Sequence, residues 1–311
     1  MSVRYANQAF LHPALFYRGA DEFTAGVVSF VRDGLAAGEP VAVAAPPEHV
    51  SLVRAELGAD ADRVLLVDMT EAGRNPGRII PGVLRAFADG HPDQHVRIVG
   101  EPVWAGRSPA EYPACAQHEA LINLAFEGRW ATILCPYDAE ALGATELADA
   151  LRTHPWLIDG AGEWRSSGDY APDAVVADYN RELPPPPGAR SFVVAEPDLV
   201  GLRVVTAETA RRHGLAEDRV EDAVMAVSEL AVNSVEHGSG SAVVRLGFAD
   251  GELVCQVRDE GWLADPMAGR VPASPDQVRG RGLLLVNHLA DLVRMHSDPA
   301  GSTVEARFAA G

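Results

Sequence analysis

Three polar residues recur at a spacing of four within the helical pattern EDRVEDAVMAVSELAVNSVEHG: Glu229, Asn233 and His237. Residues four apart share one face of a helix, so a carboxylate, a carboxamide and an imidazole would project together. A carboxamide oxygen is a neutral ligand that suits Mg²⁺, which keeps several waters and bridges substrate phosphates. The structural alternative is a solvated polar stripe that ends in a helix-terminal His237. For the helix taken alone, the solvated stripe is the expected interpretation, because charged helix faces are usually just solvated.

Two glycine-containing segments favour a nucleotide site. VRDEGW places Asp259 at the end of a strand-like run and Gly261 two residues later, and GRGLLLV places Gly280 and Gly282 at the start of a helical run. Glycine lets a backbone approach a ligand closely, and a helix N-terminus offers unpaired N–H groups to a phosphate. The Asp259 carboxylate is suited to accept a hydrogen bond from the amino group of a base. Each segment is a weak signal alone, and their order and spacing make the prediction more specific.

Over residues 188–311 these segments resemble the ATP-binding domain of the GHKL superfamily, to which gyrase and the histidine kinases belong. They are most similar to bacterial anti-sigma factors that are also serine/threonine kinases. ELAVNSVEHG resembles the N-box, DEGW the first glycine box and RGRGLLLV the second. The resemblance implies that Glu229 is the general base and that Asn233 is the Mg²⁺ ligand. It implies an ATP-binding set of Asn233, Asp259, Gly261, Gly280, Gly282 and, in the terminal GSTVEARF, Thr303.

The segment between the glycine boxes departs from the family pattern. Leu263 stands where a second glycine is usual, and the expected ATP lid, LADPMAGRVPASPDQVR, is short and contains proline. The chain has no Lys, so the basic candidates for the phosphates are Arg270, Arg279 and Arg281. Arginine can bind phosphate bidentately. These departures keep open a non-catalytic, partner-binding module as the alternative to a kinase.

The first half carries polar residues where strand-like runs end. GEPVW (100–104) and CPYDAE (135–140) follow two such runs, and open α/β sheets place ligand clefts at the carboxyl ends of strands. We expect a sensor pocket there, although turn chemistry and core capping explain the same residues. This half has neither G-x-x-x-x-G-K-[ST] nor G-x-G-x-x-G after a strand, which leaves a nucleoside triphosphatase unsupported. The expected pocket residues are Glu101, Trp104, His118, Glu119, Asn123, Cys135 and Tyr137.

Over residues 10–160 the chain also resembles a known sensory module, the MEDS domain. The similar blocks are HPALFYRGADEF, DGLAAGEPVAVAAP, GRNPGRIIP, GEPVWAGRSPAEYPACAQHEALINLAF and CPYDAEAL. The resemblance implies a sensor built on a RecA-like or KaiC-like sheet that lacks the phosphate loop. It does not name the ligand.

The elements that position these residues fall into two patterns. Short Val/Ile/Leu-rich runs alternate with helical patterns in the first half, which predicts an α/β domain with an open, mostly parallel sheet. The strand-like runs are 40–45, 63–69, 95–100 and 130–135, and the helical patterns are 23–38, 47–58, 78–90 and 109–126. Neighbouring strands beside grouped helices in the second half predict an α+β sandwich with helices on one face. Its expected elements are strands 191–196, 241–248, 252–259 and 302–308, a hairpin turn at Asp250–Gly251, and helices 197–213, 216–236 and 282–294.

A proline run divides the two halves. RELPPPPG favours an extended polyproline II segment that continues neither a helix nor a central strand. We therefore predict a sensory domain over 1–180, a linker over 181–190 and an ATPase domain over 191–311.

Composition limits the partners and the compartment. The 311 residues include 26 Lys+Arg and 44 Asp+Glu, a formal net charge of −18, which argues against a general nucleic-acid binder or an anionic membrane surface. No apolar run approaches the ~20 residues of a membrane span, and the N-terminus has no apolar signal core. Three isolated cysteines make neither a disulfide framework nor a C-x-x-C pair, so we expect a reduced, cytoplasmic protein without a structural metal.

The predicted function is that of an anti-sigma regulatory factor with serine/threonine kinase activity. It would bind a sigma factor and use ATP and Mg²⁺ to phosphorylate an anti-anti-sigma partner of the STAS type, under control of the sensor domain. Related kinases often dimerise through the sheet of the ATP domain, and a homodimer stays open here. A two-component histidine kinase is weaker, because RELPPPPGAR occupies the place of its phosphoacceptor hairpin.

Overall fold

The structure is a computed structural model that describes residues 9–195, 198–238, 240–272 and 281–310. The chain separates into two compact units. The first comprises Met1–Arg74 and Ile79–Tyr179, and the second comprises Asn75–Arg78 and Asn180–Gly311. The short segment 75–78 belongs to the second unit, where the Asn75 carboxamide donates to the backbone oxygen of Asn287 at 2.8 Å.

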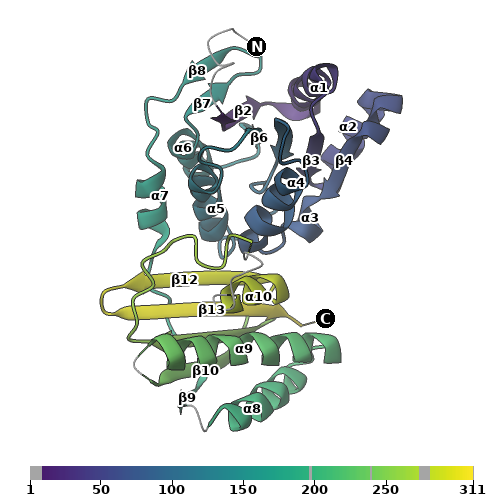
Figure 1. Cartoon of the computed structure of the whole chain (residues 1–311). Coiled ribbons are helices and arrows are strands. Elements are labelled where there is room, and N and C mark those ends of the chain that lie inside the picture. Colours follow the sequence, from purple (N-terminus) through teal and green to yellow (C-terminus); the bar gives the residue numbers. More distant parts are fainter. Residues whose placement is uncertain (1–8, 196–197, 239, 273–280, 311) are drawn as a thin grey trace. The chain divides into compact units, whose positions relative to one another are not determined.

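The first unit is built on an eight-stranded sheet in the order β4-β3-β5-β6-β2-β7-β8, with β1 paired to β6 (Figure 1). All its pairs are parallel except β7–β8. The expected mostly parallel α/β sheet is confirmed, and β1, β2, β7 and β8 are additional strands. The strands are β1 (Phe10–Leu11), β2 (Pro13–Tyr17), β3 (Val41–Ala45), β4 (Val64–Asp68), β5 (Val96–Gly100), β6 (Ala131–Asp138), β7 (Trp156–Ile158) and β8 (Trp164–Ser166).

Helices cover both faces of this sheet. Val41, Val43 and Ala45 of β3 share a core with the apolar faces of α1 and α2, and successive strand residues point to opposite faces. On the other face, Cys135 of β6 lies beside Glu119 of α5. The helices are α1 (Gly19–Ala37), α2 (Pro47–Leu57), α3 (Met69–Ala72), a π-helical turn (Ile80–Arg85) continued by α4 (Ala86–Asp89), α5 (Tyr112–Ala125), α6 (Ala144–Thr153) and α7 (Pro172–Tyr179), with a 3₁₀ turn at Gly58–Arg63.

The second unit is an antiparallel five-stranded sheet in the order β12-β13-β11-β10-β9. Helices α8, α9 and α10 pack on one face through Leu202, Leu230 and Val286, against alternate strand residues such as Leu246 and Cys255. The expected α+β class is confirmed. The elements are β9 (Arg190–Val194), α8 (Leu199–Arg212), α9 (Glu217–His237), β10 (Ala242–Ala249), β11 (Glu252–Asp259), α10 (Gly282–Leu289), β12 (Leu292–Asp298) and β13 (Gly301–Ala309), with a 3₁₀ turn at Pro76–Arg78.

Two local expectations in this unit have opposite outcomes. The Asp250–Gly251 turn is confirmed, since both residues have positive φ, 54° and 81°, as a two-residue hairpin of type I′ requires. The expected helix 282–294 is too long. Ala290 leaves the helical region at φ −79° and ψ 152°, and Leu292 begins a strand that pairs with β13.

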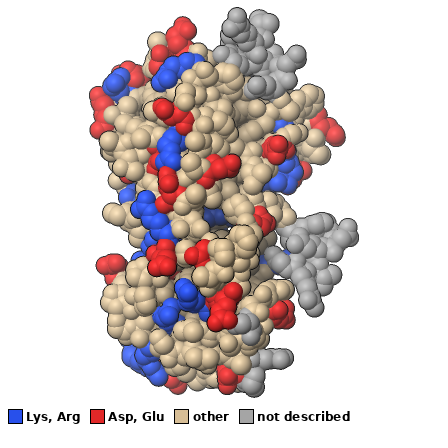
Figure 2. Space-filling view, turned by 90° about the vertical axis from the view of Figure 1, so that its left-hand side faces the viewer, with Lys and Arg blue, Asp and Glu red and all other residues tan. Residues whose placement is uncertain are grey.

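No helix among the described residues is both long and apolar enough to cross a bilayer. On the face shown in Figure 2, arginine side chains lie interspersed with acidic ones.

Candidate functional site

Helix α9 carries two of the expected site residues, Asn233 in the wall of a cavity in the second unit and Glu229 beside it. Its buried side includes Val227, Leu230 and Ala231, which fix the rotation of the helix against the sheet. Glu229 and Asn233, both half-buried, come from the neighbouring face one turn apart. His237 follows one turn later, is exposed and also lines the cavity.

The start of α10 comes directly against these side chains at Gly282. A Cβ atom there would lie 2.6 Å from Nδ2 of Asn233 and 3.1 Å from Oε2 of Glu229. A larger residue at 282 would therefore displace the ends of these two side chains. Within the described residues, the N-cap residue Arg281 makes no side-chain capping hydrogen bond. The N–H groups in the first turn of a helix suit an anionic ligand.

Asp259, at the end of β11, lies at the other end of the cavity. Its Oδ2 accepts a hydrogen bond from the Ser234 hydroxyl at 2.5 Å, and its Oδ1 accepts one from the Gly261 N–H at 2.6 Å. A carboxylate has about four acceptor sites, so two bonds fix its orientation and leave capacity for a further donor. Sequence reasoning missed Ser234, whose position one residue after Asn233 is its only signal.

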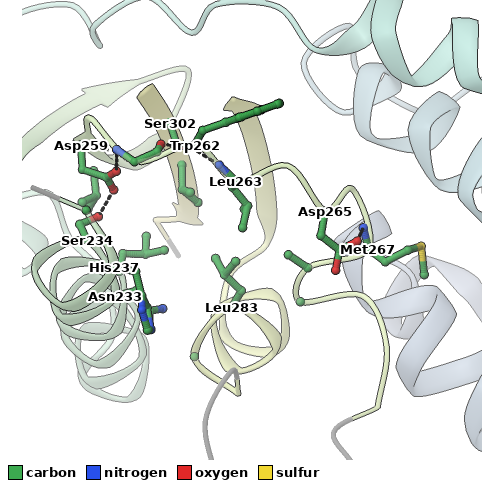
Figure 3. A pocket seen from close by; sticks show the side chains of 18 of the residues that line it. Asn233, Ser234, His237, Asp259, Trp262, Leu263, Asp265, Met267, Leu283 and Ser302 are labelled. Carbon is green, nitrogen blue, oxygen red and sulfur yellow. Dashed lines mark hydrogen bonds between the residues drawn. The ribbon is translucent and has the colours of Figure 1, made fainter. Parts of the chain in front are cut away.

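The cavity has a volume of about 340 Å³. Figure 3 shows Ser234, Asp259 and Ser302 grouped at one end, and Asn233 of α9 opposite Leu283 of α10. Asp265 and Met267 belong to the described start of the expected lid, and both line the cavity. The other lining residues are Leu230, His237, Gly238, Val257, Gly261, Trp262, Leu263, Ala268, Gly269, Val271, Gly282 and Val304.

Leu263, where the family pattern has glycine, is held through its backbone. Its N–H lies 2.8 Å from Oγ of Ser297 and 3.2 Å from Oγ of Ser302. The anchoring uses a main-chain group that every non-proline residue has, which explains how leucine fits at this position.

The expected adenine contact at Thr303 differs from the structure. Ser302 and Val304 line the cavity, and side chains alternate along a strand, so the buried Thr303 faces away from it. Ser302 supplies the hydroxyl at this end and donates to the Gly261 carbonyl at 2.7 Å. Arg281 is exposed beside α10, whereas the expected Arg279 and Gly280 lie outside the described residues.

The donor set fits a magnesium nucleotide. Asp259 offers an oriented acceptor at one end of the cavity, and Val257 and Leu263 provide apolar walls. At the other end a carboxamide, a carboxylate and the N-terminus of α10 meet at Gly282. Mg²⁺ takes oxygen ligands, and phosphates bind helix N-termini.

The expected sensor residues of the first unit do not form one group. Glu101 follows β5 and is buried, with its carboxylate 2.7 Å from Nδ1 of His49 and 3.2 Å from the Tyr17 hydroxyl. Burial raises the pKa of Glu101. Burial alone would lower the pKa of His49, but the hydrogen bond and charge of Glu101 raise it overall. Trp104 lies apart, with the Arg107 guanidinium 3.8 Å from its ring centroid.

Four of the expected residues, Glu119, Asn123, Cys135 and Tyr137, do come together on the α5 side of the sheet. Glu119 and Cys135 lie with His12 and His154, and their donor atoms are all within 4.8 Å of one another. Asn123 contacts Nδ1 of His12 at 3.2 Å. Tyr137 packs its ring edge-on against His154 at 5.4 Å, and His118 is buried on α5. His12 and His154 were missed because nothing in the sequence brings residues so far apart together.

Comparisons with known proteins match both units. A family model of the MEDS domain, the MEthanogen/methylotroph, DcmR Sensory domain, matches residues 11–155, and one of the histidine kinase-like ATPase domain matches residues 193–308. Serine-protein kinase RsbW of Bacillus licheniformis is 35% identical over 125 residues, which are 35% of this chain and 78% of that protein. RsbW of Bacillus subtilis (strain 168) is 34% identical over 127 residues, 36% of this chain and 79% of that protein.

A solved structure of the RsbU and RsbW domains of Rv1364c from Mycobacterium tuberculosis matches with a TM-score of 0.30 and 21% identity, over 39% of this chain and 32% of that chain. The RsbW matches cover more than two thirds of each relative. The chain therefore belongs to the family of the RsbW serine-protein kinases, with a histidine kinase-like ATPase domain that follows a MEDS sensory domain.

Proposed function

We propose that this chain is a regulatory serine/threonine kinase of sigma-factor control. Its second domain binds a sigma factor and uses ATP with Mg²⁺ to phosphorylate a serine or threonine of a STAS-type anti-anti-sigma partner. Support comes from the identity to RsbW kinases and from the site itself. The observation that carries the proposal is the meeting of Glu229 and Asn233 at Gly282, with an oriented Asp259 in the same cavity.

Each end of the cavity has a distinct part in holding ATP. Asp259, fixed by Ser234 and Gly261, accepts from the exocyclic amino group of adenine. The first turn of α10 faces the phosphates, and Arg281 adds positive charge beside it. Asn233 holds Mg²⁺ through its carboxamide oxygen, and the ion neutralises phosphate charge when bound.

Glu229 is the base of the transfer. Its carboxylate takes the proton of the incoming serine or threonine hydroxyl, while that oxygen forms a bond to the γ-phosphorus and the bond from phosphorus to the leaving oxygen of ADP breaks. The products are phosphoserine or phosphothreonine and ADP, and the proton passes from Glu229 to solvent. The fixed separation of one helical turn keeps the base beside the metal ligand.

The test is phosphoryl transfer from labelled ATP to a purified STAS partner by the full chain. We expect Glu229→Gln to slow transfer by about 10²–10⁴-fold, the usual contribution of a positioned base, with ATP affinity unchanged. Glu236→Gln is the matched control, because Glu236 is exposed on the same helix and the charge change is identical. Equal transfer by the two variants would remove Glu229 from the role of base.

The same assay decides the alternative, a non-catalytic partner-binding module. Leu263 and the short lid segment favour that alternative, whereas the paired Glu229 and Asn233 favour catalysis. ATP binding by the wild-type chain without any phosphoserine or phosphothreonine on the partner would establish the non-catalytic module.

The remaining parts complete the regulatory scheme. We propose a sensory domain over 1–180 with a RecA-like or KaiC-like sheet, a linker over 181–190, and an ATPase domain over 191–311. A signal at the sensory domain shifts the kinase between states only if it binds those states with different affinity. Kinase activity that is the same with and without the sensory domain would contradict this part of the scheme.

A further inference from the structure

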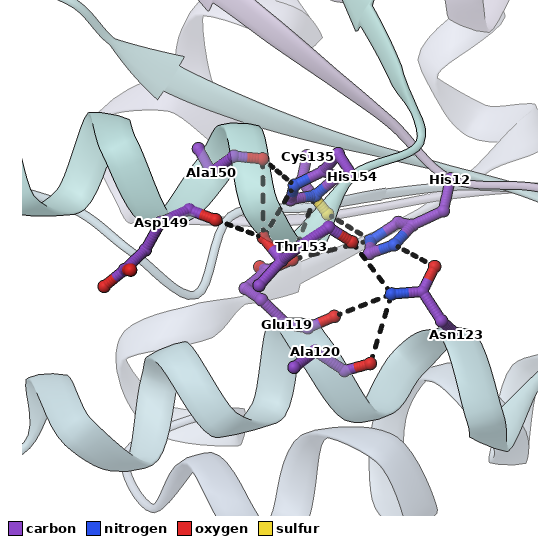
Figure 4. Close-up of polar contacts among 9 residues, drawn as sticks. All are labelled: His12, Glu119, Ala120, Asn123, Cys135, Asp149, Ala150, Thr153 and His154. Atoms are coloured by element: carbon purple, nitrogen blue, oxygen red, sulfur yellow. Dashed lines mark hydrogen bonds and ion pairs between the residues drawn. The ribbon is translucent and has the colours of Figure 1, made fainter. Parts of the chain in front are cut away.

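Four buried side chains of metal-binding type converge in the first unit (Figure 4). His12 lies between β1 and β2, Cys135 in β6, Glu119 in α5, and His154 at the C-cap of α6. Their exposed fractions are 0% for His12, Cys135 and His154 and 1% for Glu119. A carboxylate and polar rings so deeply buried are costly unless each is matched by a partner.

Hydrogen bonds outside the cluster fix which ring nitrogens face inward. The Asn123 carboxamide donates to the Thr153 carbonyl at 2.8 Å and to the Ala120 carbonyl at 3.1 Å, so its Oδ1 accepts from Nδ1–H of His12 at 3.2 Å. Nδ1 of His154 lies 2.9 Å from the Ala150 carbonyl, to which it donates. Each ring therefore directs the Nε2 lone pair inward, the arrangement by which outer partners orient metal-binding histidines.

Several inward-facing acceptor atoms lack a donor, whereas Nε2 of His12 has the Cys135 thiol 3.4 Å away. Within the described part of the chain, the two carboxylate oxygens of Glu119 have no hydrogen-bond partner. The same is true of Nε2 of His154. Nε2 of His154 lies 3.1 Å from Oε2 of Glu119, and Nε2 of His12 lies 3.5 Å from it. With both rings donating through Nδ1, these approaches bring lone pairs together. A cation at the centre would turn this repulsion into attraction.

Three of the six spacings among the donor atoms are close to the edges of a tetrahedron around zinc, and all six lie within 4.8 Å. Zn–N and Zn–O bonds of about 2.0–2.2 Å give edges of about 3.3–3.5 Å, and a Zn–S bond of about 2.3 Å gives an N–S edge of about 3.6 Å. The corresponding distances are 3.1 and 3.5 Å for the two N–O edges and 3.4 Å from Nε2 of His12 to Sγ of Cys135. The other donor atoms would close in from spacings of up to 4.8 Å to complete the tetrahedron.

We propose that His12, Glu119, Cys135 and His154 form a closed, four-ligand site for Zn²⁺. The two nitrogens and one sulfur favour zinc over Mg²⁺ or Ca²⁺, which prefer oxygen. A thiolate and a carboxylate together cancel the charge of the ion, which allows burial. Four protein ligands leave no open position, so the site is structural or regulatory rather than catalytic. The sequence alone predicted no structural metal, because these ligands form no local motif.

The site has a consequence for the sensory unit. The ion would join the β1–β2 junction, β6, α5 and the end of α6, so its binding couples four segments of one fold. The thiol proton of Cys135 is released to solvent when the ion binds, and affinity rises with pH accordingly. The inference is independent of the kinase proposal, since it concerns the first unit only.

The test uses the full chain, stripped by chelator and then titrated with ZnCl₂ or CoCl₂. We expect one zinc per chain by metal analysis, a rise in the melting temperature on adding zinc, and with cobalt the visible and charge-transfer bands of a tetrahedral site with a thiolate ligand. Cys135→Ser should remove the charge-transfer band, and His154→Gln should abolish stoichiometric zinc. Cys115→Ser and Cys255→Ser are matched controls, because both thiols are buried and lie outside the cluster.

The substitution Asn123→Ala tests whether Asn123 orients the His12 ring toward the metal or only supports the fold. Losing an outer partner of a ligand typically weakens metal binding by about 10–100-fold without removing it, so cobalt should still give the tetrahedral spectrum at higher concentration. If a ligand variant fails to fold, the wild-type stoichiometry and cobalt spectrum still decide the outcome. The proposal would be overturned if the wild-type chain binds no zinc. It would also be overturned if Cys255→Ser reduces zinc binding as much as Cys135→Ser does.

Discussion

The substitution Asp259→Asn tests the proposed recognition of adenine. The carboxylate holds two inward hydrogen bonds, from the Ser234 hydroxyl and from the Gly261 N–H. Asparagine can keep both, with its oxygen toward Gly261 and its NH₂ toward the serine oxygen. The acceptor for the exocyclic amino group of adenine is then replaced by a donor. We therefore expect an intact fold and weak ATP binding.

The magnitude follows from the bond that is lost. A hydrogen bond to a charged group contributes about 1.5–3 kcal/mol, which corresponds to about 10- to 140-fold in affinity. Guanine presents an oxygen where adenine presents its amino group, so the preference for ATP over GTP should fall by more than the ATP affinity itself.

Isothermal titration of the full chain with ATP and with GTP measures both quantities. Asp265→Asn is the control, because Asp265 also lines the cavity but is exposed, and among the described residues its side chain accepts from the Met267 N–H, which asparagine does equally well. The reasoning fails if the two variants bind ATP alike, or if Asp259→Asn keeps the wild-type selectivity for ATP.

Three further changes test other parts of the structure. Gly282→Ala places a methyl group 2.6 Å from Asn233, so the Mg²⁺-dependent part of ATP binding should fall with no loss of melting temperature; unchanged titrations would contradict the close approach. The raised pKa values of His49 and Glu101 mean that the folded state binds more protons than the unfolded state. For His49 this stability is fully present below the unfolded His pKa of 6.5 and is lost as pH rises through the folded value, and for Glu101 it is lost as pH rises from the unfolded Glu pKa of 4.5 through the folded value. Glu101→Gln should therefore flatten the pH dependence of the unfolding free energy, measured by urea denaturation between pH 5 and 8, whereas an unchanged pH dependence would refute it. Gly251→Ala forces a side chain to φ 81° and should cost about 1 kcal/mol in the same assay without altering ATP affinity, and a stability equal to wild type would contradict the turn assignment.

Elements whose apolar residues recur at a clear helical or strand spacing could be predicted from the sequence. Elements without such a spacing, or without a glycine or proline at their boundary, could not. The 3.6-residue apolar pattern around Val227 and Leu230 defined α9. Leu292–Asp298 was missed as a strand because no glycine or proline separates it from α10, and only pairing with β13 decides its conformation. Strand β2 begins at Pro13, which is unusual inside a sheet, so its place between β6 and β7 is a tertiary outcome.

The site residues that lie together on one helix could be predicted from the sequence. Glu229 and Asn233 follow from helical spacing. The choice between Ser302 and Thr303 depends on which alternate residues of the strand face the cavity, and the sequence pattern does not decide this. His12 and His154 join Glu119 and Cys135 only after the first sheet forms. No short-range spacing in the sequence predicts that cluster.

The central claim is that Asn233 binds the magnesium ion of ATP in the cavity of the second unit. ATP titration of the full chain with and without Mg²⁺, for the wild type and for Asn233→Ala, tests it most directly. We predict that Mg²⁺ strengthens ATP binding and ligand-induced thermal stabilisation in the wild type, and that Asn233→Ala loses this increment while it keeps the metal-independent part. An equal Mg²⁺ increment in both proteins would contradict the claim.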